Sequence, residues 1–304
     1  MSWLADLGAV LSVGVLASGV RLAVPTALAA IGETISQRAG IFNLGLEGMM
    51  MVCAFAGFAV ASSLGSATLG LAAGALAGAA LASLMVIGAL WHGTNVIVTG
   101  FALVLLGQGL ANFLYASTQD RLPTFAPLPE LGLGPLADVP VLGRVVVQQN
   151  ALLVLTLGIA ILVSLLIART RFGLEVDASG SDPRSAASKG VPVRRARSLA
   201  VLCAGLFAGL GGAAITVGSV GNFGSNITAG KGFVAISLVA LARQRIGWAL
   251  VAAFLFGTLE AAEARLQDVD GVPVELLPAL PWVAVVIALV VLAVSRTHRV
   301  RRAA

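Results

Sequence analysis

Charged residues are scarce in this chain of 304 residues, and their scarcity excludes most soluble fold classes. Asp, Glu, Lys and Arg together make up 11% of the sequence, whereas about 25% is usual in a soluble domain. Hydrophobic residues reach 58% and the mean hydropathy is +0.98. Several apolar runs have the roughly 20 residues that a helix needs to cross a bilayer. The sequence therefore predicts an all-α, polytopic membrane protein, folded as one helical bundle over residues 1–304.

Residues that form catalytic or metal centres are also few. The two cysteines, Cys53 and Cys203, lie inside apolar runs and provide neither a disulfide framework nor a metal-ligand spacing. His92 and His298 have no serine or cysteine partner in a motif, and no glycine-rich loop ends in Gly-Lys-Ser/Thr. We therefore expect no enzyme activity, no metal and no cofactor in this chain. If it moves a solute at the expense of ATP, another chain must supply the nucleotide site.

About ten membrane crossings are expected from the apolar runs. The first run has an acid and no base before it, whereas a cleaved signal peptide begins with basic residues, so it is expected to remain as a helix. An external loop is expected at about 118–148 and a strongly polar loop at about 169–197. The expected spans are 3–20, 22–36, 43–64, 67–91, 94–117, 150–168, 197–219, 228–243, 246–266 and 276–295.

The basic residues predict the orientation of these spans. Lysine and arginine are enriched in the cytoplasmic loops of membrane proteins, so we place the 169–197 loop in the cytoplasm. Fourteen of the nineteen basic residues and both termini then lie inside the cell. The net charge of +5 is thus a signal of topology in a multi-pass protein of the cell (inner) membrane, in contact with lipid, and nucleic-acid binding is not expected. The five basic residues left outside are Arg21, Arg121, Arg144, Lys231 and Arg265.

Two segments interrupt the apolar pattern with glycine, asparagine and charge. They are SQRAGIFNLGLEG, residues 36–48, and SVGNFGSNITAGKGF, residues 219–233. On the expected map they lie on opposite sides of the membrane, one in each half. Interrupted helices at corresponding places point to an inverted repeat with a substrate path between the halves. The candidates for this path within the breaks are Asn43, Glu47, Asn222, Asn226 and Lys231.

Glu47 poses the sharpest question in the first break. A carboxylate about one turn inside a membrane helix costs a few kcal/mol unless it is paired or hydrated. Asn43 precedes it by four residues, so the two would share a helix face, and Asn43 would cap that helix. Either Glu47 pairs with a cation such as Arg38 and holds the broken helix in shape, or it borders a water-filled path. Both alternatives remain open from the residues alone.

Other polar residues within the helices either bond to neighbouring helices or line the path. Asn95 shares a face of the fifth helix with Thr99, and Gln108 shares another with Asn112. Glu260 lies deep in the ninth helix, where Lys231 is the cation expected to meet it. Small residues dominate elsewhere, as in GLAAGALAGAALAS and AGLFAGLGGAA, and they predict close packing of helix backbones.

The 169–197 loop contains a predicted short helix. Ser181 or Asp182 would cap it, Pro183 would occupy its first position and Gly190 would stop it. So short a helix is not stable by itself, so it needs a partner surface, either anionic lipid or a cytoplasmic protein. A capped helix inside a charged loop favours docking to a protein.

Three stretches of this sequence resemble the ABC-importer permeases of the branched-chain amino acid, ribose and nucleoside type. They are AIGETISQRAGIFNLGLEGMMMVCAFAGF, DASGSDPRSAASKGV, and the run from CAGLFAGLGGAAITVGSVGNFGSNITAGKGF onward. Within that group the chain looks most like the shorter of the two permeases in nucleoside or simple-sugar systems. The resemblance covers about residues 20–270, and RAGIFNLGLEG and NITAGKGF are its specific motifs.

The resemblance implies a translocation subunit that is not itself an enzyme. It would pair with a second, related permease in a heterodimer, stand on a cytoplasmic ATPase that binds ATP and Mg, and receive a small polar solute from an external substrate-binding protein. The loop helix would be the coupling helix that seats in the ATPase, through Asp182, Pro183, Arg184, Ser185, Ala187, Ser188, Lys189 and Gly190.

An ion-coupled secondary transporter is the alternative reading. In it, Glu33, Glu47 and Glu260 would relay protons or sodium. The solute is not readable from the residues. Nucleosides would favour aromatic stacking and amides, for which Phe42 and Phe223 are available beside the asparagines.

Overall fold

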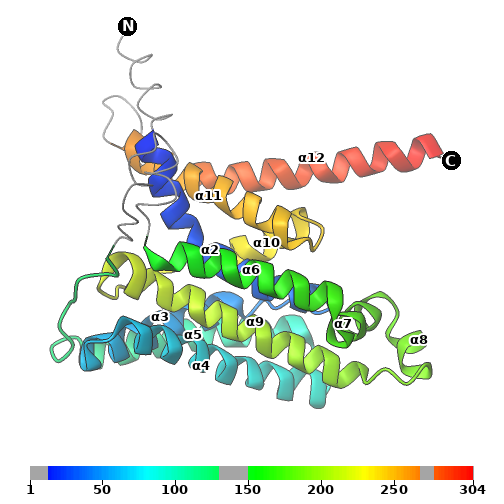
Figure 1. Ribbon diagram of the computed structural model, residues 1–304, viewed down its shortest axis with the longest axis horizontal. Helices are drawn as coiled ribbons and strands as arrows, with labels where there is room; N and C mark the ends of the chain where they lie inside the picture. Colours follow the sequence, from blue (N-terminus) through cyan, green and yellow to red (C-terminus); the bar gives the residue numbers. More distant parts are fainter. Residues whose placement is uncertain (1–12, 130–149, 268–276, 304) are drawn as a thin grey trace, which may run out of the picture.

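The computed structural model describes residues 13–129, 150–267 and 277–303, with side chains as far as Val291. These residues are mostly helical (Figure 1), as the composition predicts. The elements are α2 (Val13–Arg38), α3 (Leu46–Leu64), α4 (Ala67–Met85), the π-helix η1 (Val86–Trp91), α5 (Val96–Thr118), α6 (Ala151–Arg169), α7 (Arg171–Ser181), α8 (Pro183–Ser188), α9 (Val193–Ile215), the π-helix η4 (Thr216–Val220), α10 (Lys231–Leu241), α11 (Ile246–Leu266), the 3-10 turn η5 (Leu277–Ala279) and α12 (Leu280–Ala303).

Seven of the described helices are long and apolar enough to cross a membrane, so the expected count of about ten is not confirmed. The chain is thereby a multi-pass membrane protein. The expected spans 3–20 and 22–36 are wrong as separate helices, because α2 runs without a break from Val13 to Arg38. A single Arg21 does not end a helix, and Pro25 removes only one backbone hydrogen bond. Residues 3–12 of the first expected span lie outside the described residues.

The expected crossing at 228–243 is also wrong as a helix. Its helical part, α10, has 11 residues and spans about 16 Å at 1.5 Å per residue, roughly half of a hydrocarbon core. The residues before it, 221–230, form turns in which Asn226 and Ala229 have positive φ angles of 59° and 45°. Glycine and asparagine adopt this conformation readily, so the second break is a half-helix preceded by irregular backbone.

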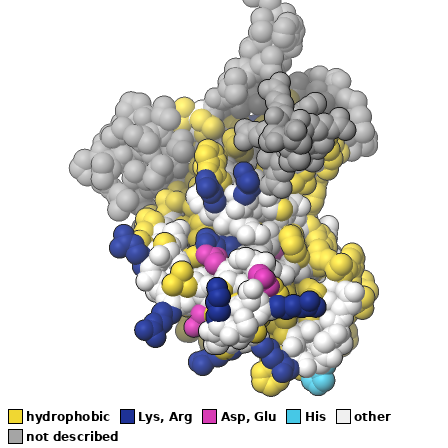
Figure 2. Space-filling view, turned by 90° about the vertical axis from the view of Figure 1, so that its right-hand side faces the viewer, with side chains coloured by type: hydrophobic (Ala, Val, Ile, Leu, Met, Phe, Trp, Pro, Cys, Tyr) yellow, Lys and Arg dark blue, Asp and Glu magenta, His cyan; other side chains and the backbone are white. Residues whose placement is uncertain are grey.

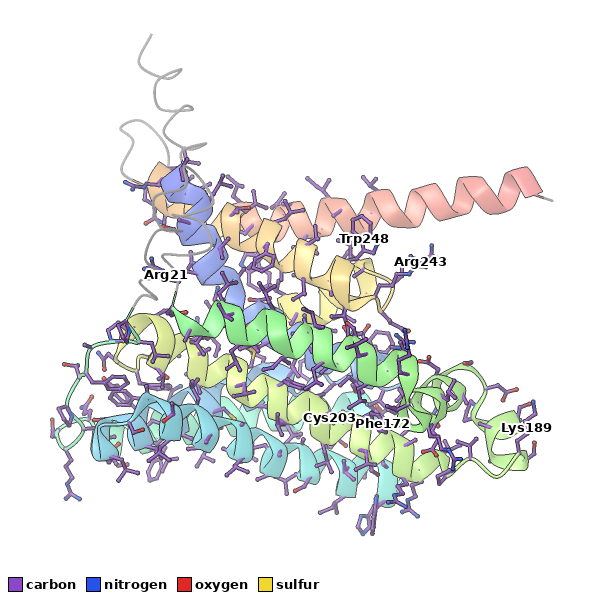
Figure 3. The ribbon with its side chains drawn as sticks, viewed as in Figure 1. Arg21, Phe172, Lys189, Cys203, Arg243 and Trp248 are labelled. Carbon is purple, nitrogen blue, oxygen red and sulfur yellow. The ribbon has the colours of Figure 1, made fainter. Side chains whose placement is uncertain are left out.

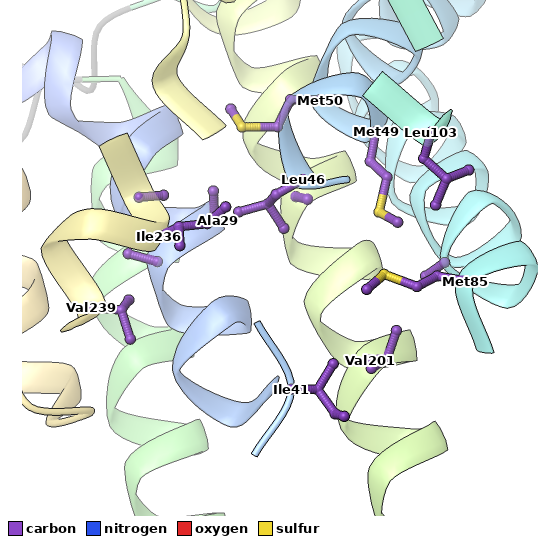
Figure 4. Packing of buried hydrophobic residues seen from close by; sticks show 14 of the residues in the cluster. Ala29, Ile41, Leu46, Met49, Met50, Met85, Leu103, Val201, Ile236 and Val239 are labelled. Carbon is purple, nitrogen blue, oxygen red and sulfur yellow. The ribbon is translucent and has the colours of Figure 1, made fainter. Parts of the chain in front are cut away.

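Figure 1 shows α3, α4, α5, α6 and α9 lying side by side, with α7 and α8 at one end of the bundle. Helix α2 packs along both α9 and α11, which places it between two groups of helices. A buried apolar cluster fills the space where these elements meet, and it includes Leu46, Met49, Met85 and Ile236 (Figure 4). The two breaks therefore adjoin the centre of the core.

Glycine brings α4 and α9 into direct backbone contact. A Cβ atom built on Gly78 would lie 2.1 Å from the carbonyl oxygen of Gly205, and one on Gly209 would lie 2.2 Å from that of Gly74. Any side chain at these positions would push the two helices apart. This geometry confirms the predicted close packing of the glycine-rich stretches. In lipid there is no hydrophobic drive between helices, so close van der Waals packing of this kind holds them together.

Basic side chains gather at the end of the bundle that carries α7 and α8. Figure 2 views this end and shows several Lys and Arg side chains spread across its face. Lys189 and Arg243 lie at this end in Figure 3, whereas Arg21 lies at the opposite one. The separation agrees with the expected topology; which end faces the cytoplasm stays a prediction.

We expect Gly78→Val to destabilise the bundle, because the added side chain would have to displace the backbone of α9. Overpacking of this kind costs about 1–3 kcal/mol and sometimes more. The measurement is the melting temperature of the purified protein in detergent. Gly109→Val is the matched control, since a Cβ at Gly109 on α5 meets nothing within 4 Å. Equal melting temperatures for the two variants would contradict the close approach of α4 and α9.

Candidate functional site

Glu47 of α3 binds the first turn of α10. Its Oε1 atom accepts hydrogen bonds from the Thr228 hydroxyl at 2.5 Å and from the Gly230 N–H at 3.0 Å. Its Oε2 atom accepts from the Gly232 N–H at 2.7 Å. A helix N-terminus attracts anions because its first N–H groups are free and its dipole is positive there. Glu47 is 1% exposed and thus caps α10 from a distant part of the chain.

This contact corrects three predictions about the first break. Glu47 does not pair with Arg38, whose guanidinium binds Asp177 instead. Asn43 does not cap α3, which starts at Leu46 after Gly45 and has no side-chain cap, so Asn43 and Glu47 do not share a helix face. The two breaks do not lie on opposite sides, because Glu47 joins them directly. The inverted repeat remains a prediction.

A second set of buried polar contacts involves Glu33 of α2. Glu33 Oε1 accepts hydrogen bonds from the Gln37 amide at 3.0 Å and from the Asn43 N–H at 3.2 Å. The Gln37 amide also donates to the Ile236 carbonyl of α10 at 3.1 Å. All three polar side chains are buried. Because this set and the Glu47 contacts both bind α10, we refer to Glu33, Gln37, Asn43, Glu47 and Thr228 together as the polar cluster.

The polar cluster has acceptor atoms to spare. Glu33 Oε2, Gln37 Oε1 and Asn43 Oδ1 are buried and have no hydrogen-bond donor among the described residues. Buried acceptors are normally paired, so these three oxygens are exceptional in lacking a donor. Gln37 and Thr228 were not among the predicted site residues. Gln37 could have been found from its spacing of four residues from Glu33, which places the two side chains next to each other on a helix. Nothing in the sequence marked Thr228.

Lys231 and Glu260 meet as the sequence predicts. The Lys231 Nζ atom lies 2.5 Å from each carboxylate oxygen of Glu260, and it also lies 5.9 Å from the centre of the Phe256 ring. The side chains are 10% and 20% exposed. The pair therefore ties the first residue of α10 to α11 with little solvent around it.

The remaining predicted path residues lie apart from these contacts. Asn95 caps α5 by accepting from the Ile97 and Val98 N–H groups, which is a structural role. Gln108 is half-buried and Asn112 is exposed on α5. Asn222 is half-buried and its side-chain oxygen accepts from the Phe223 N–H at 2.7 Å, and Asn226 is exposed in the turn before α10.

The predicted short helix is α8, and it has the predicted cap. Asp182 Oδ1 accepts from the Ser185 and Arg184 N–H groups at 3.1 Å each, and these bonds, those of Ser185 above all, lower the pKa of the Asp182 carboxyl. Pro183 occupies the first position and Gly190, at φ 84°, ends the turn. Only Ala186 is buried, so α8 projects from the bundle (Figure 1). The exposed side chains are Arg184, Ser185, Ala187, Ser188 and Lys189.

Two arginines attach α7, and through it α8, to the first break. Arg38 at the end of α2 binds Asp177 of α7 through two hydrogen bonds of 2.7 and 2.6 Å. Arg197 of α9 donates to the Ala39 carbonyl at 3.1 Å and to the Ser179 carbonyl at 2.9 Å. A bidentate arginine–carboxylate pair has a defined geometry, so α7 and the break are held in one arrangement.

Comparisons with known proteins agree with a polytopic membrane protein. The family described as "Branched-chain amino acid transport system / permease component" matches residues 15–295, and the chain belongs to this family. The resemblance read from the sequence is thereby confirmed, and the chain is a permease, a component of a transport system.

Similar curated proteins are permeases as well. A Haloferax volcanii protein, provisionally named glucose ABC transporter permease protein TsgC13, is 36% identical over 84% of this chain and 79% of its own length. The nucleoside ABC transporter permease protein NupC of Lactococcus lactis subsp. cremoris is 30% identical over 87% of each chain. The guanosine ABC transporter permease protein NupQ of Bacillus subtilis is 29% identical over 93% of each. No solved structure shows a significant match.

We expect Glu47→Gln to lower the melting temperature, because an amide nitrogen would face an N–H group of α10 that now has a carboxylate acceptor. Loss of a charge-assisted hydrogen bond to a buried donor costs about 1.5–3 kcal/mol. Thr228→Val should cost less, and Thr228→Ser, which keeps the hydroxyl, should be close to the native protein. If the Glu47→Gln variant had the same melting temperature as the native protein, α10 would not depend on this cap.

We expect Glu260→Gln to destabilise the protein by about 2 kcal/mol, because it leaves the Lys231 charge without its partner in a poorly hydrated site. The variant that combines Lys231→Met with Glu260→Gln should recover most of this loss, since both charges are then gone. Melting temperatures of the two single variants and the double variant measure the coupling between the residues. Additive effects would mean that the ion pair contributes no coupling energy.

Proposed function

We propose that this chain is one translocation subunit of an ATP-binding cassette importer for a nucleoside or simple sugar. It pairs with a second, related permease, binds a cytoplasmic ATPase that holds ATP and Mg, and receives solute from an external substrate-binding protein. The chain itself carries out no chemical reaction. Its termini and α8 lie on the cytoplasmic side of the cell membrane.

The observation that carries the proposal is the exposed, capped helix α8. A helix of six residues does not form alone, so Asp182 and Pro183 hold its shape for a partner. Ala187 and Ser188 are small and exposed, which lets a partner groove approach the backbone closely. Docking to the ATPase supplies the contact surface that this projecting helix lacks.

Movement at α8 has a direct route to the polar cluster. Helix α8 follows α7, and α7 is bound to the end of α2 by Arg38 and Asp177. Arg197 binds the carbonyl of Ala39, the first residue after α2. From there Asn43 contacts Glu33 and Glu47 contacts α10. A displacement of α7 would therefore strain the contacts that hold the half-helix.

The relatives support the choice of solute. The names of the proteins from Haloferax, Lactococcus and Bacillus refer to glucose, nucleosides and guanosine, all of which are rich in hydroxyl groups. The spare oxygens of Glu33, Gln37 and Asn43 accept hydrogen bonds from such groups. Two further relatives, TsgB13 and NupB, share name stems with TsgC13 and NupC, which supports a pair of related permeases.

The alternative is an ion-coupled secondary transporter with Glu33, Glu47 and Glu260 as relays. The geometry gives it less support, because Glu47 is saturated by three hydrogen bonds and Glu260 is neutralised by Lys231. Uptake by this chain alone in proteoliposomes, without an ATPase, would favour the alternative.

We expect Ala187→Trp to weaken assembly with the ATPase or to uncouple ATP hydrolysis from transport, because the indole would fill the space between α8 and its groove. The measurement is ATPase stimulation by solute-loaded binding protein in the reconstituted complex. Ala187→Ser is the control, since it keeps the side chain small. Arg184→Glu should impair coupling too, by reversing a charge on the exposed face.

Normal stimulation and normal uptake in both the Ala187→Trp and Arg184→Glu variants would contradict the proposal. In that case α8 would be a lipid anchor. The melting temperature of each variant without ATPase should equal that of the native protein, because both side chains are exposed.

A further inference from the structure

An apolar groove runs between α10, α11 and α12. It consists of two adjoining cavities of about 440 and 200 Å³ that share Leu241, Ala252 and Leu255 in their walls. The walls of the smaller cavity, including Phe256, Leu259 and Val285, are entirely apolar. Leu255 is 61% exposed, so the groove opens to the outside of the bundle along its length.

Positive charge lies at only one end of this groove. Arg243 and Arg245, which join α10 to α11, line the larger cavity together with Trp248. Both arginines are exposed, and among the described residues neither side chain has a hydrogen-bond or ion-pair partner. Figure 3 shows Arg243 and Trp248 near the end of the bundle that carries α7 and α8.

The backbone holds the two arginines in place. Arg243 and Gln244 have positive φ angles of 55° and 59°, an unfavourable conformation for residues other than glycine. The turn is nevertheless closed by hydrogen bonds from the Arg243 N–H to the Ala240 carbonyl and from the Gln244 N–H to the Val239 carbonyl. Strained backbone that surrounding bonds maintain is a common feature of binding sites.

We infer that this groove binds one anionic phospholipid. Its acyl chains lie along Leu241, Leu255 and Leu259, and its phosphate binds Arg243 and Arg245, with Trp248 at the level of the headgroup. Tryptophan favours the membrane interface, where its ring is apolar and its N–H remains hydrated. Arginine binds phosphate through paired N–H donors, and the cytoplasmic leaflet, which this end faces under the proposed orientation, is rich in anionic lipid.

The site has a route to the transport machinery. Arg243 and Arg245 also line a polar cavity of about 520 Å³ whose other walls include Gln37, Arg38 and Asp177. A phosphate on the two arginines therefore lies next to the ion pair that attaches α7 to α2.

The test is lipid retention by the purified full-length protein, with any subunits that accompany it, in native mass spectrometry. The protein is exchanged into nanodiscs of phosphatidylglycerol, phosphatidylcholine or equal parts of both before release. We expect one tightly retained phosphatidylglycerol and no retained phosphatidylcholine. Since each basic residue near a membrane surface contributes about 1 kcal/mol, Arg243→Gln with Arg245→Gln should weaken retention about thirtyfold.

Two controls separate this site from general attraction. Arg171→Gln with Arg195→Gln removes the same charge from exposed positions at the same end and should leave retention unchanged. Ala252→Trp fills the groove where the two cavities meet and should abolish retention while both arginines remain.

Three outcomes would overturn the inference: equal retention of the two lipids, an equal loss in the control double variant, or a second permease in the groove in place of lipid. The last would be seen as a subunit that leaves the complex when Trp occupies position 252. None of these measurements involves ATPase coupling, so a failure of the lipid inference can be distinguished from a failure of the proposed function.

Discussion

The contact on which the rest of the site depends is the one between the Glu47 carboxylate and the first N–H groups of α10. A helix that starts within a membrane bundle has several free backbone donors at its N-terminus, and the hydrocarbon core of a bilayer offers no water to bind them. Glu47 accepts hydrogen bonds from two of these N–H groups and from the Thr228 hydroxyl. The contact stabilises both groups, because burying the carboxylate without hydrogen-bond donors would also cost free energy.

This mutual dependence fixes the position of the half-helix. α10 is held at its start by Glu47 and by the Lys231–Glu260 pair, and farther along by Gln37, which donates to the Ile236 carbonyl. Its other end leads to Arg243 and Arg245. Helix α10 thus connects the polar cluster with the basic end of the bundle, where α8 and the proposed lipid site lie.

Several features were predictable because they depend on local chemistry. The cap and first residue of α8 follow from Asp182 and Pro183, and the approach of α4 to α9 follows from the spacing of glycines. The Glu260–Lys231 pair was also predicted, since few other cations were available at that level. The partner of Glu47 was not, because two of its three donors are backbone N–H groups and all three lie some 180 residues away in the chain. Nearly every residue carries a backbone N–H group, so the sequence does not show which of them will bind Glu47. The irregular backbone at Asn226 and Ala229 precedes the N–H groups that do.

The sequence by itself determined that this chain is a helical membrane protein with basic residues gathered at certain loops, and that its interior holds two polar breaks. Hydropathy and charge are sums over residues, so they can be calculated from the sequence without knowledge of the fold. The tertiary structure alone decided that α2 is one helix, that α10 is half a crossing, and that the two breaks meet. Those outcomes depend on which buried donors find acceptors, and that matching is a property of the packed helices as a whole.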